Sequence, residues 1–172
     1  MVSPIGDSRT LDPIPNITIR FATPNDAEAI ASLLFESFVE YEPLYTPEGF
    51  AATAITTEQI VARTSEGPVW VSVREEEIVG TVSVVAKAQS LYLRGMAVLP
   101  LARGERIGAL LLTHVEEFAR TEGFSRLFLG TTPFLDRAIR LYERFGFRRT
   151  SDGPHELFGT PLFTMGKLSR VE

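Results

Sequence analysis

The 172-residue sequence contains no cysteine, and this absence removes several classes of protein at once. A chain without thiols has no disulfide framework, no thiolate metal site and no cysteine-bound acyl intermediate. The two histidines, His114 and His155, lie far apart in the sequence and lack the spacing of metal ligands. We therefore expect no metal.

The sequence also lacks an excess of positive charge and a long apolar run. It has 17 Lys and Arg against 22 Asp and Glu, so it does not have the basic character of a nucleic-acid-binding protein. No stretch approaches the roughly 18 apolar residues of a membrane span, and residues 1–16 lack the apolar run of a signal peptide. We expect a cytoplasmic protein that binds neither nucleic acid nor membrane, with residues 1–16 as a loose N-terminal arm.

The apolar content is sufficient for one domain. Hydrophobic residues make up 44% of the chain, enough to fill a continuous core at this length. No internal repeat or second domain is visible, so residues 17–168 are predicted to form a single domain. A homodimer is compatible with this organisation.

Hydrophobic periodicity and turn residues predict the order of the elements. Strands are expected at residues 17–22, 69–74, 78–86, 90–98, 127–130, 147–150 and 162–165, and helices at about 24–38, 56–65, 107–122 and 135–145. Antiparallel strands come first, followed by an alternation of strands and helices. This order predicts an α/β domain of the α+β type, with a mixed, mostly antiparallel central sheet and helices on both faces.

The segment 96–108 joins a strand, a glycine-bearing loop and the start of the most strongly periodic helix, which Gly123 is expected to end as a C-cap. A helix start directs free backbone N–H groups and the positive end of the helix dipole at one point, which suits a phosphate or pyrophosphate. Arg103 and Arg106 would add charge-assisted hydrogen bonds. A tight turn with a solvated arginine face explains the same residues.

Two motifs resemble those of a known family. Residues 103–108, Arg-Gly-Glu-Arg-Ile-Gly, look like the acetyl-CoA loop of the GNAT superfamily of N-acetyltransferases, Arg/Gln-x-x-Gly-x-Gly/Ala. Residues 138–147, Ala-Ile-Arg-Leu-Tyr-Glu-Arg-Phe-Gly-Phe, are similar to the family's Ala-x-x-Leu-Tyr-x-x-x-Gly-Phe element. The two lie in the usual order around a strand, and the resemblance extends over about residues 17–168.

The resemblance implies an acyltransferase with a GNAT-type domain that uses acetyl-CoA as co-substrate. In the family, the main chain of the strand that ends at Val98 pairs with the pantetheine arm, and the following loop wraps the pyrophosphate. The cofactor-binding residues implied here are Met96, Ala97, Val98, Arg103, Gly104, Glu105, Arg106, Ile107, Gly108, Ala109, Leu135 and Ala138.

By the same resemblance, Tyr142 is the catalytic acid that protonates the leaving thiolate. An inward aromatic on an amphipathic helix would fit the periodicity equally well. Two positions depart from the family pattern: Arg106 stands where the loop usually has glycine, and Leu135 where many members have an asparagine that binds the pantetheine. We expect that polar contact to be absent or to come from Thr131 or Thr132.

The general base is not assigned. An amine must lose a proton before it attacks a thioester, but the strand at residues 90–96 has no carboxylate, where many members use a glutamate. Other candidates for the general base lie near the first helix, in its following loop and in a distant segment: Glu36, Glu40, Glu42, His155 and Glu156. Each of them can equally be an ordinary solvated residue.

The acceptor pocket is predicted from position. Phe38, Tyr41 and Tyr45 would wall it, and Arg94 on the central strand would bind a substrate carboxylate or, equally, be an outward-facing charge. If Arg94 binds carboxylate, the acceptor is an amino acid or peptide-like acid. If it does not, a polyamine, an aminoglycoside or a protein N-terminus remains open.

Three functions remain after these observations. The first is an N-acetyltransferase that transfers the acetyl group of acetyl-CoA to a primary amine of an amino-acid-like small molecule or a peptide, by direct attack in a ternary complex. The second is a noncatalytic acyl-CoA-binding sensor, which the missing strand carboxylate would permit. A nucleotide-binding protein ranks last, because the loop has neither a P-loop ending nor a Gly-x-Gly-x-x-Gly turn.

Overall fold

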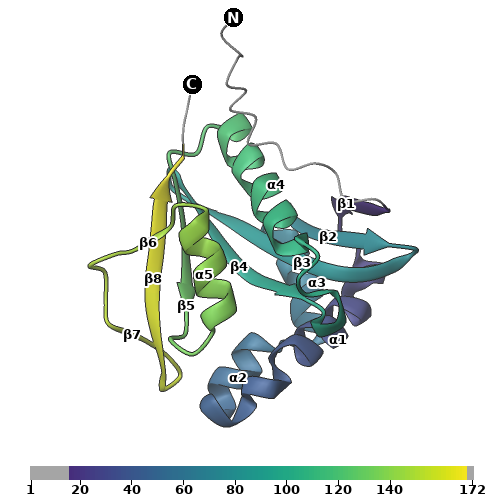
Figure 1. Cartoon of the computed structure of the whole chain (residues 1–172), viewed down its shortest axis with the longest axis horizontal. Helices are drawn as coiled ribbons and strands as arrows, with labels where there is room; N and C mark the ends of the chain where they lie inside the picture. Colours follow the sequence, from purple (N-terminus) through teal and green to yellow (C-terminus); the bar gives the residue numbers. More distant parts are fainter. Residues whose placement is uncertain (1–15, 170–172) are drawn as a thin grey trace, which may run out of the picture.

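A twisted, eight-stranded sheet runs through the whole molecule (Figure 1). The computed structural model describes residues 16–169, so the predicted N-terminal arm, residues 1–16, lies outside the described residues except for Asn16. The strands are β1 Ile17–Phe21, β2 Val69–Arg74, β3 Glu77–Lys87, β4 Ser90–Val98, β5 Arg126–Thr131, β6 Arg148–Arg149, β7 His155–Leu157 and β8 Thr160–Leu168. The α-helices are α1 Ala27–Phe38, α2 Pro47–Thr53, α3 Thr57–Glu66, α4 Ile107–Glu122 and α5 Asp136–Arg144, with 3₁₀ turns η1 Pro24–Asp26, η2 Val39–Leu44 and η3 Pro100–Ala102.

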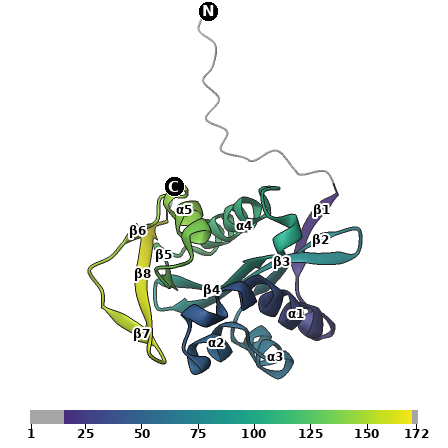
Figure 2. The ribbon, with the colours of Figure 1, turned by 60° about the horizontal axis from the view of Figure 1, so that its bottom comes forward.

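The strands follow the order β1-β2-β3-β4-β5-β8-β6, and β7 pairs with β8. All pairings are antiparallel except that of β4 with β5. Helices α4 and α5 cover one face of the sheet, and α1, α2 and α3 lie on the other (Figure 2). The mixed, mostly antiparallel sheet with helices on both faces confirms the predicted fold class.

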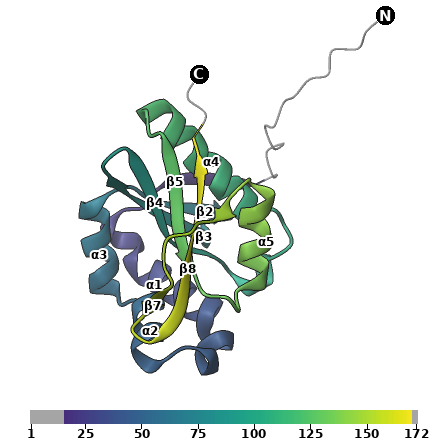
Figure 3. The same cartoon turned by 90° about the vertical axis from the view of Figure 1, so that its left-hand side faces the viewer.

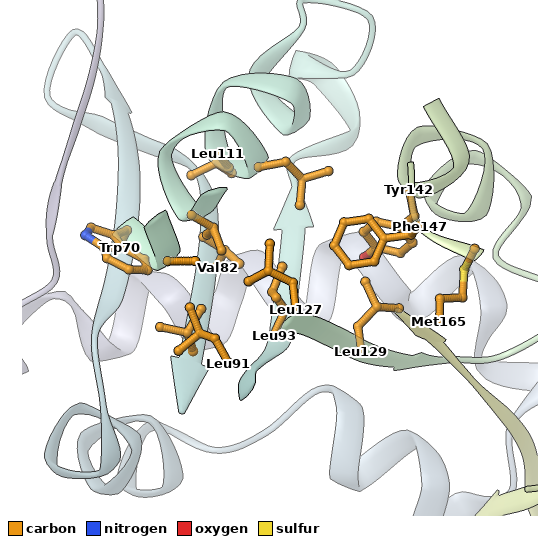
Figure 4. Packing of buried hydrophobic residues seen from close by; sticks show 14 of the residues in the cluster. Trp70, Val82, Leu91, Leu93, Leu111, Leu127, Leu129, Tyr142, Phe147 and Met165 are labelled. Atoms are coloured by element: carbon orange, nitrogen blue, oxygen red, sulfur yellow. The ribbon is translucent and has the colours of Figure 1, made fainter. Parts of the chain in front are cut away.

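Each face of the sheet has its own hydrophobic core. On one face, α1 and α3 bury Leu33, Leu34 and Ile60 against β2. On the other, α4 buries Leu111 against strands from β2 to β8, and these side chains converge in Figure 4. Because β2 to β5 are covered on both sides, they read as nearly continuous apolar runs rather than as alternating ones.

Helix α4 follows its sequence signals closely. Its buried positions recur at helical spacing, and Gly123 ends it in the left-handed conformation with φ of 80°. The hairpin predicted from residues 74–77 also forms, although Glu75 and Glu76 both take positive φ in its two-residue turn. These local signals set the strand–helix order on which the rest of the fold is built.

The sheet opens between its two parallel strands. Strands β4 and β5 pair only from Ser90 with Arg126 to Leu93 with Leu129, although β4 continues to Val98. The cause lies in β4: opposite β3, three steps from Arg94 to Ala97 match two steps from Ser83 to Thr81, which is a β-bulge at Gly95, with φ of 63°. The bulge turns β4 away from β5, and the two diverge in Figure 1.

Two elements were not predicted. Helix α2 begins at Thr46, whose side chain accepts a hydrogen bond from the Gly49 N–H, and has Pro47 at its first turn. That cap-and-proline pair was present in the sequence as a helix signal. Strand β7 forms a hairpin with β8 around Phe158 and Gly159, and Figure 3 shows this hairpin beside α2. Within residues 16–169, no helix is long and apolar enough to cross a membrane.

Replacing Leu111 tests the importance of the α4 core. Its side chain is fully buried, so Leu111→Ala should lower the free energy of unfolding by about 2–5 kcal/mol through lost burial and a residual cavity. Leu101→Ala is the matched control, because Leu101 is 96% exposed and its truncation should change stability by less than about 0.5 kcal/mol. Urea unfolding measures both, and equal losses would contradict this account.

Candidate active site

A cleft of about 890 Å³ opens where β4 and β5 part. Residues 93–98 of β4 and 129–131 of β5 form its two sides, and β4 has no β5 partner beyond Leu93. The start of α4 and helix α5 line it on one face of the sheet, while α1, η2 and α3 line it on the other. The gap between the strands therefore connects the two faces.

The N-terminus of α4 presents free hydrogen-bond donors to this cleft. Arg106 occupies the cap position, and no side chain caps the helix. The first N–H with a helical partner is that of Leu110, which donates to the Arg106 carbonyl at 3.1 Å. Within the described residues, the N–H groups of Ile107, Gly108 and Ala109 are left without acceptors, and an anion can bind them.

The backbone conformation of Arg106 explains why the family usually has glycine at this position. Its backbone is left-handed, with φ of 63° and ψ of 17°, a conformation that costs an L-residue with a side chain about 1–2 kcal/mol. Gly104, with φ of 85°, takes a similar conformation two residues earlier. The loop thus keeps the glycine-like backbone despite the arginine, and its side chain lines the cleft.

Gly108 is required mainly by packing. A Cβ at this position would lie 2.9 Å from Leu141 Cδ2 and 3.4 Å from Met96 Cε. The absent side chain allows α4 to approach both α5 and β4. This close approach brings the free N–H groups of α4 to the edge of the opening between the strands.

Two loop side chains point elsewhere than expected. Arg103 lines the cleft, but its guanidinium is paired with Glu40 and donates to the Ser37 carbonyl at 2.9 Å, which ties the loop to α1 and η2. Of the predicted cofactor-binding residues, Glu105 alone does not line the cleft within the described structure, and its carboxylate is paired with Arg74 of β2. A role for Glu105 in binding is thereby limited to its main chain.

Helix α5 contributes an arginine face that the sequence analysis missed. Arg137, Arg140 and Arg144 all line the cleft. Their spacing of three and four residues places them on one side of a helix, and this pattern was readable from the sequence. Together with the α4 N-terminus, they make this end of the cleft strongly cationic.

Tyr142 lies between the core and the cleft. It is only 9% exposed and packs edge-on against Phe147, with ring centroids 5.9 Å apart (Figure 4). Burial, with a smaller contribution from Tyr45, raises the pKa of Tyr142 to about 12. The phenol therefore keeps its proton at neutral pH, as a proton donor requires.

Near Tyr142, one polar group is unsatisfied. The buried hydroxyl of Thr132 has no hydrogen-bond partner among residues 16–169, while that of Thr131 donates weakly to the Thr132 carbonyl at 3.4 Å. Leu135, at the N-cap of α5, has no side-chain hydrogen bond to give. Of the two threonines expected to replace the missing asparagine, Thr132 has the free hydroxyl.

Aromatic side chains wall the other end of the cleft. Phe38, Tyr41 and Tyr45 all line it, as expected. Tyr41 stacks on Phe134 at 6.1 Å and Tyr45 meets the same ring edge-on at 4.8 Å, which links η2 to the loop before α5. Arg94 lies on this wall as well, and Arg63 of α3, which sequence reasoning missed, is beside it.

Among residues 16–169, the side chains that line the cleft include no carboxylate and no imidazole. Glu36, Glu40, Glu42, His155 and Glu156 are all exposed and lie outside its lining. A role for one of them as general base, directly or through a water chain, stays a prediction. Their segments turn these side chains to solvent. Within the described part of the chain, no group of three or more acidic or histidine side chains could hold a metal ion.

Comparison with known proteins gives the family. The profile of the acetyltransferase (GNAT) family matches residues 28–147. The uncharacterised N-acetyltransferase YjgM of Escherichia coli (strain K12) is 31% identical over 135 residues, which cover 75% of this chain and 80% of that protein. The chain therefore belongs to the GNAT family of acetyltransferases, which confirms the family and the acetyl-CoA-dependent enzyme class predicted from the two motifs.

Two further relatives show how far the similarity extends. N-acetylaspartate synthetase of Danio rerio is 36% identical over 104 residues, covering 59% of this chain but only 36% of that protein's length. The PaiA N-acetyltransferase of Thermoplasma acidophilum, solved in complex with coenzyme A, has a TM-score of 0.76 at 18% identity and covers 88% of this chain and 98% of its own. The latter likeness shows the fold.

The left-handed cap can be tested with two variants. Arg106→Gly and Arg106→Ala both remove the guanidinium, but only glycine relieves the backbone strain at φ of 63°. We expect Arg106→Gly to be more stable than Arg106→Ala by about 1 kcal/mol. Urea unfolding measures the difference, and equal stabilities would mean that the loop relaxes out of the left-handed conformation.

Proposed function

We propose that this protein is an N-acetyltransferase that transfers the acetyl group of acetyl-CoA to a primary amine of an amino-acid-like small molecule or a peptide, by direct attack within a ternary complex. The observation that carries the proposal is one continuous cleft with an anion-binding helix start on one face of the sheet, a buried phenol at its middle and an aromatic wall on the other face. The chain has no cysteine to carry the acetyl group as a relay.

The residues present fit acetyl-CoA. The free N–H groups of Ile107, Gly108 and Ala109 would hold its pyrophosphate, and Arg106 and the arginine face of α5 would add charge-assisted contacts to its phosphates. The main chain of Met96 to Val98 would pair with the pantetheine arm, since β4 has no β5 partner there. The unsatisfied Thr132 hydroxyl supports a polar contact in place of the family's asparagine.

Acetyl transfer would form an amide C–N bond and break the C–S bond of the thioester. An ammonium acceptor loses two protons, the first to solvent before the attack and the second from nitrogen as the C–N bond forms. Tyr142 donates a proton to the leaving thiolate, and water passes the second nitrogen proton to the Tyr142 oxygen, which restores the phenol. Its burial keeps the hydroxyl protonated at working pH. Because a thiolate is a weaker base than this phenolate, the proton passes to sulfur in concert with the return of the nitrogen proton to the Tyr142 oxygen.

The first proton must leave without a carboxylate or histidine in the cleft. The positive charge of nearby arginines disfavours a second cation, so a bound ammonium has a lower pKa than in water and loses its proton to solvent more readily. Water in the cleft carries that proton away. In this account the chain activates the amine by electrostatics rather than through a dedicated base.

A noncatalytic acyl-CoA sensor is the second candidate, favoured by the same absence of a base in the cleft lining. The two functions share cofactor binding, so only turnover separates them. The experiment is thiol release from acetyl-CoA across amino acids, peptides, polyamines and aminoglycosides. Release that requires one acceptor class supports the enzyme. Cofactor binding without release across the panel supports the sensor.

Tyr142→Phe tests the proton donor. Removing the hydroxyl should lower kcat by about 100-fold or more, the usual contribution of a general acid, and leave KM for acetyl-CoA nearly unchanged. The ring still fills its place against Phe147, so the free energy of unfolding should stay close to that of the wild type. An unaltered kcat would reduce Tyr142 to a packing residue.

The pH profile tests the absence of a base. Below the pKa of the free amine, kcat/KM for the acceptor should rise about tenfold per pH unit, because the described cleft lining contains no Asp, Glu or His that could act as a base. The pKa of Tyr142, raised to about 12, puts loss of the acid above that range, so no alkaline decline is expected there. A plateau beginning near pH 6 or 7 would reveal a base outside the cleft lining.

A further inference from the structure

Two arginines meet at the acceptor end of the cleft. Arg94 comes from β4 and Arg63 from α3, and both line the opening on the face opposite α4 and α5. Arg94 is paired with Glu66 of α3, but its Nε is buried and has no hydrogen-bond partner among the described residues. Arg94 therefore keeps an unused donor after its ion pair is made.

Arg63 has even fewer partners. In the part of the chain from residue 16 to residue 169, it makes no hydrogen bond and no ion pair. Burial, and next the positive charge of Arg94, lower the pKa of its guanidinium, although Glu66 and Tyr92 oppose the shift. The N–H groups of this partly exposed guanidinium have no acceptor among the described protein residues, so they are available to a bound anion.

The bulge in β4 makes room for this arginine. A Cβ at Gly95 would lie 2.6 Å from Arg63 Nη1, closer than such atoms approach. The left-handed φ of 63° at Gly95 also disfavours any other residue there. The same glycine that opens the sheet thus lets a cation from α3 enter the opening.

The charges at this end do not balance. Arg63 and Arg94 are faced by a single carboxylate, Glu66, whose side chain is 48% exposed and pairs with Arg94 only. Glu66 itself lies outside the cleft lining, to which residues 16–169 contribute no acidic group. The pair of arginines therefore carries one positive charge more than Glu66 neutralises. A guanidinium donates two parallel hydrogen bonds to a planar carboxylate, which makes a carboxylate a suitable ligand for this charge.

We propose that Arg63 and Arg94 form a carboxylate-binding subsite and that the acceptor is a free amino acid, held by its carboxylate while its amine faces the cleft. This inference rests on the proposed N-acetyltransferase function and narrows its acceptor. Polyamines and aminoglycosides are disfavoured, because their additional cations would face two arginines.

Glu66 has a defined part in this subsite. It neutralises Arg94 when no acceptor is bound, and it competes with the substrate carboxylate for the same guanidinium. The ion pair between Glu66 and Arg94 is weak, because Glu66 lies at the surface of α3, where solvent screens its charge. Removing its charge should therefore strengthen acceptor binding, the opposite of what removing either arginine should do.

The experiment measures thiol release from saturating acetyl-CoA with L-amino acids and, side by side, with their carboxamides, which keep the amine and lose the carboxylate. For the wild type we expect kcat/KM to favour the best acid over its carboxamide by roughly 10- to 100-fold, the range for hydrogen bonds to a charged group. Arg63→Gln and Arg94→Gln should each remove most of this preference through KM.

Two further variants keep the test independent of folding. Glu66→Gln changes only a surface side chain and should lower KM for the acid about two- to fivefold without affecting the carboxamide. Arg120→Gln is the matched control for the arginine variants, because Arg120 is an exposed residue of α4 paired only weakly with Glu117. It should preserve the preference of the wild type.

The outcomes separate this inference from the function on which it rests. Release with carboxamides, polyamines or aminoglycosides at the level of the acids would overturn the subsite and leave the enzyme intact. If no amine stimulates release, the enzymatic proposal fails, and saturation-transfer NMR with the coenzyme A-bound protein decides the subsite. Signals from L-amino acids that vanish in Arg63→Gln and Arg94→Gln would support it, and their absence in the wild type would overturn it.

Discussion

The structure depends on the β-bulge at Gly95. Parallel strands that pair along their whole length leave no room between them, and β4 and β5 are paired for only four residues before the bulge turns β4 away. The separation exposes the main chain of β4 through Val98 and connects the two faces of the sheet through one cleft. A single residue with positive φ therefore creates both the strand edge that would receive a pantetheine arm and the space into which Arg63 projects.

The cleft is positively charged, although the whole chain has a negative net charge. The protein has a formal net charge of −5, yet the part of the chain that the structure describes lines the cleft with no Asp or Glu and with seven arginines, Arg63, Arg94, Arg103, Arg106, Arg137, Arg140 and Arg144. Partly enclosed cations attract anionic ligands and lower the pKa of a bound ammonium, so the same electrostatics serve binding and amine activation. In the proposed mechanism, this positive charge takes over the role of the glutamate that β4 lacks.

Much of the fold was predictable, because its signals are local. The periodicity of α4, its Gly123 cap and the β2–β3 hairpin are each encoded within a few turns or residues, and the structure has them where the sequence placed them. Helix α2 was missed although Thr46 and Pro47 carry the same signal that marks Thr23 and Pro24 before the first helix. Strand β7 had a weaker signal, because its two-residue turn has Phe158 before Gly159 at positive φ, where Asn or Asp before Gly is the usual hairpin pair.

By itself, the sequence determined the family and pointed to a candidate phosphate-binding loop and the candidate acid Tyr142, because these lie within two short motifs of the linear chain. Only the tertiary structure decided which charges share the cleft. It placed Arg63 beside Arg94, which lies 31 residues later in the sequence. It also turned Glu36, Glu42 and His155 to solvent and paired Glu105 with Arg74. The physical reason is that such contacts depend on the direction of each side chain, which is set by strand register, the bulge and helix packing rather than by neighbouring residues.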